Sequence, residues 1–310
     1  MRQIIEFFKD VVTQFGRDRC SAMAAALSYY TVFSLPPLLV ILVAILGLFF
    51  GEDAAQGKVA EQLELLLGLQ AQSALQVQGL IEAASGKDEG IFATVLGVVG
   101  LVIGASGVFA QLQGAMNEAW NVAPDPERSG ILTFLIKRVL SFGMILGIGF
   151  LLLVSLAFET VLSAFGSELA DLLGAVAGPL VWLINISVSA VATTGLFALM
   201  FKVIPDAKVA WKDVGVGAVI TAALFIAGRA GIALYLGQSS PGSAYGAAGS
   251  LAVLLAWVYF AALIFFFGVE ITQVWAVRYG DGIEPEKGAV RVTRELMMQR
   301  EGEAPEPMEE

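Results

Sequence analysis

Residues 21–51 read SAMAAALSYYTVFSLPPLLVILVAILGLFFG, and these 31 residues contain no acidic or basic side chain. A helix needs about 20 apolar residues to cross the roughly 30 Å hydrocarbon core of a bilayer, so the stretch predicts a membrane segment. As one unbroken helix it would be about 46 Å long, which is more than a single straight span requires. Because Pro36 and Pro37 near its middle remove backbone donors, we expect the helix to kink or break there.

Five more apolar stretches follow along the chain. They comprise residues 91–112, 139–158, 172–201, 214–236 and 250–277. The stretch of residues 172–201 is too long for one straight span, and Pro179 favours a helix start inside it. The composition of 57% hydrophobic and 15% charged residues agrees with a membrane protein. We therefore predict an all-α fold, a polytopic membrane helix bundle with six transmembrane helices.

The lysines and arginines between the spans predict an orientation. Fifteen of the 18 lysines and arginines lie in the N-terminal segment, in the loops after the second and fourth spans, and in the tail. Lys58 and Lys87 lie in the loop after the first span, and Arg229 lies inside the fifth span. Because cytoplasmic loops carry the excess of Lys and Arg, both termini are predicted to be cytoplasmic, as in a multi-pass protein of a bacterial inner membrane.

Three polar regions flank or interrupt the predicted membrane domain of residues 21–280. Residues 1–20 form an amphipathic helix, either in the lipid headgroup region or packed on the protein's own cytoplasmic face. The apolar residues expected on one face of this helix are Ile4, Ile5, Phe8, Val11, Val12 and Phe15. Residues 52–90 form an outer helical loop, and residues 281–310 an acidic tail that we expect to be disordered. The net charge of −10 belongs to this loop and this tail, so the membrane body is neutral.

The composition excludes several kinds of site. The chain has no histidine and one cysteine, Cys20. An internal disulfide, a zinc site built on histidine or paired cysteines, and histidine-dependent catalysis are therefore excluded. We find no phosphate-binding loop and no hydrolase motif. We expect a protein that is not an enzyme, without metal or cofactor and without nucleic-acid partners; the sequence does not determine an oligomeric state.

Two ionisable residues lie inside predicted spans, where such groups are costly and often functional. Arg229 lies roughly 22 Å from the cytoplasmic end of its span and Glu270 roughly 8 Å from the end of the sixth, so a direct ion pair is not expected. Asn185 and Tyr259 lie near the depth of Arg229. Arg229 either faces a polar cavity near them or extends to the outer headgroups. Glu270 either serves a substrate or proton, or it reaches the interface or a neighbouring helix.

Hydroxyl and aromatic side chains precede the proline break of the first span. Tyr29 and Tyr30 lie six to eight residues before Pro36 and Pro37. A broken helix at membrane depth is tolerated where it lines a cavity or is buried in protein. The segment therefore predicts either one wall of a substrate cavity or a purely structural kink.

Several motifs together resemble the YihY/virulence factor BrkB family of membrane proteins. They are Ala24-Ala-Ala-Leu-Ser-Tyr-Tyr-Thr-Val-Phe-Ser-Leu-Pro-Pro-Leu; Asn117-Glu-Ala-Trp-Asn-Val, which contains Trp120; Ile204-Pro-Asp-Ala, which contains Pro205; Trp211-Lys-Asp-Val with Gly217-Ala; Tyr245-Gly-Ala-Ala-Gly-Ser, which contains Gly246 and Gly249; Trp257-Val-Tyr-Phe; and Gly268-Val-Glu-Ile-Thr-Gln-Val. They occur in order over residues 7–277, and the acidic tail lies outside them.

The resemblance implies a bacterial inner-membrane protein with six helices, but it implies little about mechanism. Some members have carried the label ribonuclease BN, which needs a histidine-rich metal site that this chain lacks. Two functions follow as hypotheses. The first is a transporter or lipid-handling protein whose membrane-lipid partner is an anionic lipid, or whose substrate is a small organic anion. The second is a non-transporting envelope assembly protein or scaffold.

Overall fold

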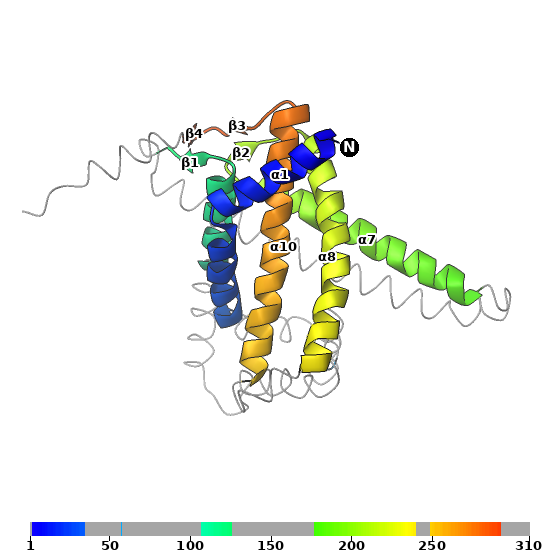
Figure 1. Ribbon diagram of the computed structural model, residues 1–310. Helices are drawn as coiled ribbons and strands as arrows, with labels where there is room; N and C mark the ends of the chain where they lie inside the picture. The colour runs from blue at the N-terminus through cyan, green and yellow to red at the C-terminus, as the bar shows by residue number, and fades with distance from the viewer. Residues whose placement is uncertain (1, 35–56, 58–106, 126–176, 240–248, 293–310) are drawn as a thin grey trace, which may run out of the picture.

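The computed structural model describes residues 2–34, 57, 107–125, 177–239 and 249–292, and within them the chain is largely helical (Figure 1). The long helices are α7 (Ala177–Val203), α8 (Trp211–Ser239) and α10 (Gly249–Tyr279). These three are long and apolar enough to cross a membrane. They confirm the helices predicted at residues 172–201, 214–236 and 250–277. The break at Pro36 and Pro37 and the second and third predicted spans lie largely or wholly outside the described residues.

Helices α8 and α10 run side by side in opposite directions (Figure 1). A Cβ on Gly217 of α8 would lie 1.8 Å from Thr272 Oγ1 of α10, and one on Gly268 of α10 would lie 1.9 Å from Thr221 Oγ1 of α8. Both threonines are fully buried, and each hydroxyl donates to the carbonyl oxygen of the glycine four residues earlier in its own helix. The two glycines therefore let the helices approach closely without leaving a hydroxyl unsatisfied.

Helix α7 packs on this pair only near its carboxyl end. Phe197 and Phe201 lie against Phe265 of α10, with ring centroids 6.1 and 5.4 Å away, and Phe197 also contacts Phe225 of α8. Toward its amino end α7 leaves the pair at a wide angle (Figure 1), and Val191 is 72% exposed. A side chain this apolar and this exposed on a long helix fits contact with lipid.

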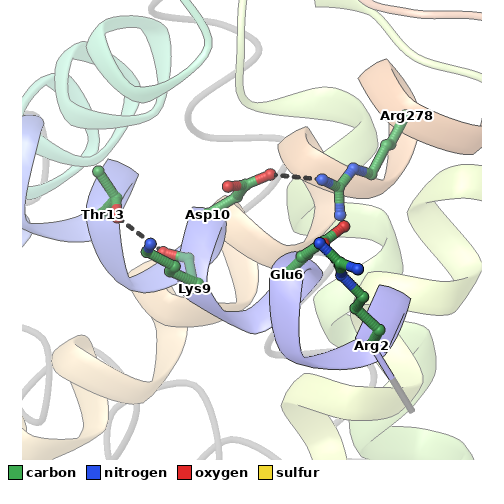
Figure 2. Close-up of polar contacts among 6 residues, drawn as sticks. All are labelled: Arg2, Glu6, Lys9, Asp10, Thr13 and Arg278. Carbon is green, nitrogen blue, oxygen red and sulfur yellow. Dashed lines mark hydrogen bonds and ion pairs between the residues drawn. The ribbon is translucent and has the colours of Figure 1, made fainter.

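Helix α1 (Arg2–Arg17) crosses α10 and docks on it. Phe7 and Val11 are buried against Ile271 and Val274 of α10. An ion pair of 2.9 Å between Asp10 and Arg278 joins the same two helices (Figure 2). The amphipathic helix predicted from the sequence is present, but its protein-facing side is centred on Phe7, which was not part of the predicted face.

The other apolar side of α1 is exposed. The exposed residues on it are Ile4, Ile5, Phe8 and Val12. Phe15, farther along the helix, lies 5.8 Å from the ring of Phe267 in α10. The sequence allowed this helix either to lie in the lipid headgroup region or to pack on the protein itself. The structure has features of both alternatives, because one side of the helix packs on α10 and the other presents apolar surface beside basic residues.

Two short antiparallel strand pairs lie at the end of the bundle that contains Trp211 and Tyr279, which we call the strand-bearing end (Figure 1). β1 (Val122–Pro124) pairs with β4 (Ala289–Arg291), and β2 (Ala207–Lys208) pairs with β3 (Glu284–Pro285). They are the only departure from the predicted all-α fold among the described residues. The pairs tie segments from three parts of the sequence together.

The strands also correct the expectation that residues 281–310 are disordered as a whole. Residues 281–292 are ordered, Ile283 is 3% exposed, and Arg291 donates to the Ile283 carbonyl oxygen. Gly282 and Gly288 have φ values of 81° and 93°, which glycine adopts at little cost, and they allow the chain to turn back. The physical reason for the error is that pairing with β1 and β2 satisfies backbone groups that composition alone leaves in water. Residues 293–310 lie outside the described residues.

Candidate functional site

An apolar groove of about 730 Å³ runs between α8 and α10, and we call it the α8–α10 groove. The lining residues are Phe15, Leu224, Ala227, Gly228, Gly231, Ile232, Phe260, Leu263, Ile264 and Phe267. At Gly228 of α8 the space for a side chain is filled by Ile264 of α10, whose Cδ1 would lie 2.4 Å from an added Cβ, whereas at Gly231 it is open. A Cβ on Gly231 would meet no atom within 4 Å. The groove can accept an elongated hydrocarbon group, since all its lining side chains are apolar.

Arg229 lies on α8 beside this groove. It directly follows the lining residue Gly228, and its side chain is exposed. It lies 18 residues after Trp211, roughly 27 Å from the strand-bearing end at 1.5 Å per residue. A guanidinium group binds phosphate or carboxylate through paired hydrogen bonds. An anionic head attached to a chain in the groove would therefore find a matching cation near the end of the groove formed by Gly231 and Ile232.

The two polar residues expected beside Arg229 are placed differently. Tyr259 of α10 is partly buried, with its ring centroid 5.8 Å from that of Phe260, a lining residue of the groove. Among the described residues no hydrogen bond joins Tyr259 to Arg229. Asn185 lies on α7, and its side chain is not described. A shared polar cavity of Arg229, Asn185 and Tyr259 therefore stays a prediction.

Glu270 occupies a second, buried position at the level where the start of the helix over residues 20–34 meets α10. Its side chain is fully buried, and Cys20 Sγ lies 3.3 Å from Glu270 Oε1 as a hydrogen-bond donor. Asp18, in the turn before that helix, lies near enough for its charge to act on Glu270. Neither Asp18 nor Cys20 was predicted as a site residue. Because Asp18 and Cys20 precede Glu270 by 252 and 250 residues, the sequence gave no signal that they lie near it.

The helix over residues 107–119 binds α10 on both sides of Glu270. Trp120 Nε1 donates to the Val269 carbonyl oxygen at 3.3 Å, and Gln273 Nε2 donates to the Ala119 carbonyl oxygen at 2.6 Å. Glu270 is thus held between two helices that are joined to α10 by hydrogen bonds. Trp120, predicted as a structural motif residue, takes part in one of these bonds.

Asn117 ties the same helix to the linker between α7 and α8. Its Nδ2 donates to Asp206 Oδ2 at 2.8 Å, and its Oδ1 accepts from the Asp206 backbone N–H at 2.8 Å. Gln113 Nε2 donates to Asp206 Oδ1 at 3.1 Å. Pro205 directly precedes this aspartate. These motif residues thus form a structural joint at the strand-bearing end, and Asp206 and Gln113 are members that sequence reasoning missed.

The other predicted residues are not brought together with Arg229. Tyr29 and Tyr30 are 57% and 43% exposed and contact each other, with ring centroids 5.9 Å apart. Trp257 lies 6.3 Å from Phe225 across the α8–α10 interface. Gly249 is the first residue of α10.

The remaining predicted positions fall outside what is described, or concern a metal. Pro36, Pro37, Tyr245 and Gly246 lie outside the described residues. In the part of the chain that the structure describes, no group of three or more Cys, Asp or Glu side chains is placed to hold a metal ion.

Comparison with known proteins gives one consistent picture. The model of a family described as virulence factor BrkB matches residues 11–293. Similar curated proteins carry the name UPF0761 membrane protein. The one from Alkalilimnicola ehrlichii is 31% identical over 97% of this chain and 67% of its own length. Those from Alcanivorax borkumensis and Vibrio campbellii are 28% and 29% identical, over 87% and 96% of this chain and 60% and 90% of their own lengths. No solved structure matches.

Proposed function

Because the chain belongs to the BrkB family of membrane proteins, we propose that it handles lipid, binding an anionic lipid with one acyl chain in the α8–α10 groove and the head at Arg229. The observation that carries this proposal is the exposed guanidinium group beside an entirely apolar groove. A small organic anion would use the arginine but leave the groove empty. A lipid uses both, so it is the better match.

The proposed orientation places the strand-bearing end in the cytoplasm of a bacterial cell, in a six-span protein of the inner membrane with both termini inside. The support is the distribution of lysine and arginine, which gather in the segments at that end. In this orientation Arg229 lies in the outer half of the bilayer, roughly 27 Å from the cytoplasmic end of α8. The lipid head would therefore belong to the outer leaflet. We propose no covalent chemistry, so the protein acts by binding and moving lipid.

The groove itself offers a sharp test. Gly231→Trp places a large side chain in open groove space, and Gly195→Trp is the matched control, since a Cβ on Gly195 of α7 also meets nothing within 4 Å. Purified protein in liposomes would be labelled with phosphatidylglycerol that carries a photoreactive acyl chain. We expect Gly231→Trp to lower labelling several-fold and Gly195→Trp to leave it unchanged. Equal labelling of both variants would refute the groove as the acyl-chain site.

The role of Arg229 is tested by competition between lipids. Unlabelled phosphatidylglycerol should displace the probe better than phosphatidylcholine in the wild type, and Arg229→Ala should remove that preference while some labelling remains. Arg2→Ala, an exposed arginine on α1, is the charge control. If Arg229→Ala keeps the preference for the anionic lipid, the head is bound elsewhere and the assignment of Arg229 is wrong.

A second candidate, a non-transporting scaffold of envelope assembly, is favoured by the exposed apolar side of α1 with Ile4, Ile5 and Phe8. A helix of this kind lies in the interface of a membrane or binds a partner. Lipid movement between leaflets separates the candidates. Fluorescent-lipid quenching in proteoliposomes should show transfer that Gly231→Trp reduces under the first proposal, and no transfer under the second.

A further inference from the structure

An apolar strip on α1 is exposed although the helix is docked on α10. Ile4, Ile5 and Val12 are between 60% and 66% exposed, and Phe8 is 44% exposed. These residues recur at helical spacing, so they form one continuous strip along the helix, which we call the α1 strip. The proposed acyl-chain site in the α8–α10 groove uses none of these four side chains.

The contacts of α1 fix the direction in which the α1 strip points. Asp10 pairs with Arg278, one residue before the end of α10 (Figure 2), whereas the neighbouring Val11 is buried against residues four to seven positions earlier in α10. Asp10 therefore points toward the strand-bearing end. Because an α-helix turns about 100° per residue, Phe8 and Val12 lie on the side of α1 opposite Asp10 and point toward the middle of α10.

The last turn of α1 agrees with this direction. Phe15 lies on the same side of the helix as the α1 strip, and its ring contacts that of Phe267, with centroids 5.8 Å apart. Phe267 precedes Arg278 by 11 residues, so it lies roughly 16 Å farther from the strand-bearing end at 1.5 Å per residue. Phe15 also lines the α8–α10 groove, so the α1 strip leads toward the apolar part of the bundle.

The level at which α1 docks matches the boundary between headgroups and hydrocarbon. α10 has 31 residues and is about 46 Å long, close to the roughly 40–45 Å thickness of a bilayer with its headgroups. Ile271 and Val274, which contact α1, lie eight and five residues before its end, roughly 12 and 8 Å from it. Trp211 and Tyr279, at the ends of α8 and α10, are 60% and 51% exposed, and exposed aromatic residues are typical of this level.

Basic side chains border the α1 strip on the side away from α10. Lys9 and Arg2 are exposed, and around the helix they come next to Ile5. An apolar strip bordered by cations is the pattern of helices that lie in the surface of a membrane containing anionic lipid. The charge and the direction of the strip therefore favour the same occupant.

We propose that α1 lies in the headgroup region of the leaflet at the strand-bearing end, with the α1 strip among the acyl chains and Lys9 at the phosphates of anionic lipids. Helices of this kind bury their apolar face roughly 5–10 Å into the boundary between headgroups and acyl chains. This lipid surface lies at the opposite end of the bundle from Arg229. The inference requires that α10 spans the membrane, but it does not require a lipid in the α8–α10 groove.

Spin labels on two neighbouring residues test the direction of the α1 strip. Val12→Cys and Thr13→Cys would be labelled in the full-length protein in nanodiscs, and because Cys20 is buried, the wild type measures the background. We expect oxygen, which concentrates among acyl chains, to reach the label at Val12→Cys several-fold better than a neutral water-soluble nickel complex does. The exposed position Thr13 should show the reverse order.

Two results would contradict the inserted helix. If the nickel complex reaches the label at Val12→Cys as readily as the label at Thr13→Cys, the α1 strip lies in water. If the label at Val12→Cys is shielded from both reagents, a protein partner or a second copy of the chain covers the strip instead of lipid.

The lipid composition of the nanodiscs tests the role of Lys9. The nickel complex should reach the label at Val12→Cys less in phosphatidylglycerol than in phosphatidylcholine, and Lys9→Gln should remove most of this difference. Lys287→Gln, which changes an exposed lysine in the turn between β3 and β4, is the charge control. Equal access in the two lipids, or a difference that Lys9→Gln leaves unchanged, would refute the binding of anionic lipid by Lys9. Arg229→Ala should not alter these readings, which separates this test from that of the proposed function.

Discussion

Replacement of Gly268 by alanine tests whether the close approach of α8 and α10 holds this part of the bundle together. The added Cβ would lie 1.9 Å from Thr221 Oγ1 and 2.7 Å from Thr221 Cγ2, whereas ordinary contact begins at 3.4 Å. The helices would have to separate by about 1.5 Å at this point. Overpacking of this kind costs about 1–3 kcal/mol. Because the contact of 1.9 Å is far below ordinary distance, we expect a cost in the upper part of this range, about 2–3 kcal/mol. The better helix propensity of alanine returns about 1 kcal/mol, which leaves a net loss of about 1–2 kcal/mol.

The single cysteine provides the assay. Cys20 is fully buried, so a thiol-reactive fluorophore reports unfolding in detergent as the temperature rises. A loss of 1–2 kcal/mol should lower the melting temperature by roughly 2–6 °C. Thr221→Ala removes both Oγ1 and Cγ2 and leaves Thr221 Cβ at 2.8 Å, so the double variant should recover part of the loss. Gly231→Ala is the control without a contact. If Gly268→Ala melts like the wild type, or if Thr221→Ala recovers nothing, the glycines do not set the helix spacing.

Three further changes test the joints around the bundle. Asn117→Ala should lower stability by about 1–3 kcal/mol because it leaves the Asp206 backbone N–H without its acceptor, and thermal unfolding measures the loss. Phe7→Ala should cost about 3 kcal/mol, whereas Phe8→Ala, 44% exposed, should cost little; similar losses would contradict the docking of α1 through Phe7. Asp10→Asn should change stability by less than about 1 kcal/mol, and the difference should shrink at high salt, because the ion pair with α10 is partly exposed.

Several elements could be predicted from the sequence because each depends on local properties. Apolar stretches of sufficient length fix where helices such as α8 and α10 lie, and the structure places their ends within three residues of the predicted ones. The N-terminal helix follows from apolar periodicity. The side of that helix that binds α10 could not be predicted, because Phe7 and Phe8 are equally apolar and only the contact with α10 distinguishes them.

The candidate sites divide in the same way. An arginine or a glutamate within an apolar stretch is visible in the sequence, so Arg229 and Glu270 could be selected there. The residues that surround these two side chains could not be predicted from the sequence. The α8–α10 groove arises from side chains of separate helices, and the partners of Glu270 come from a segment 250 residues away. The strands were missed because runs of two or three residues have no periodicity to detect.

The stretch of residues 21–51 with its five successors determined the class of this protein, because the bilayer acts on hydropathy and length within each segment. Residue types also determined what is absent, since a chain without histidine cannot build a histidine site. Only the tertiary structure decided that Gly217 and Gly268 oppose threonines, that Arg229 lies beside an apolar groove, and that Cys20 donates a hydrogen bond to Glu270. The physical reason is that these are properties of pairs of helices. Packing between two helices depends on how their shapes and registers match, and this cannot be read from the sequence of either helix alone.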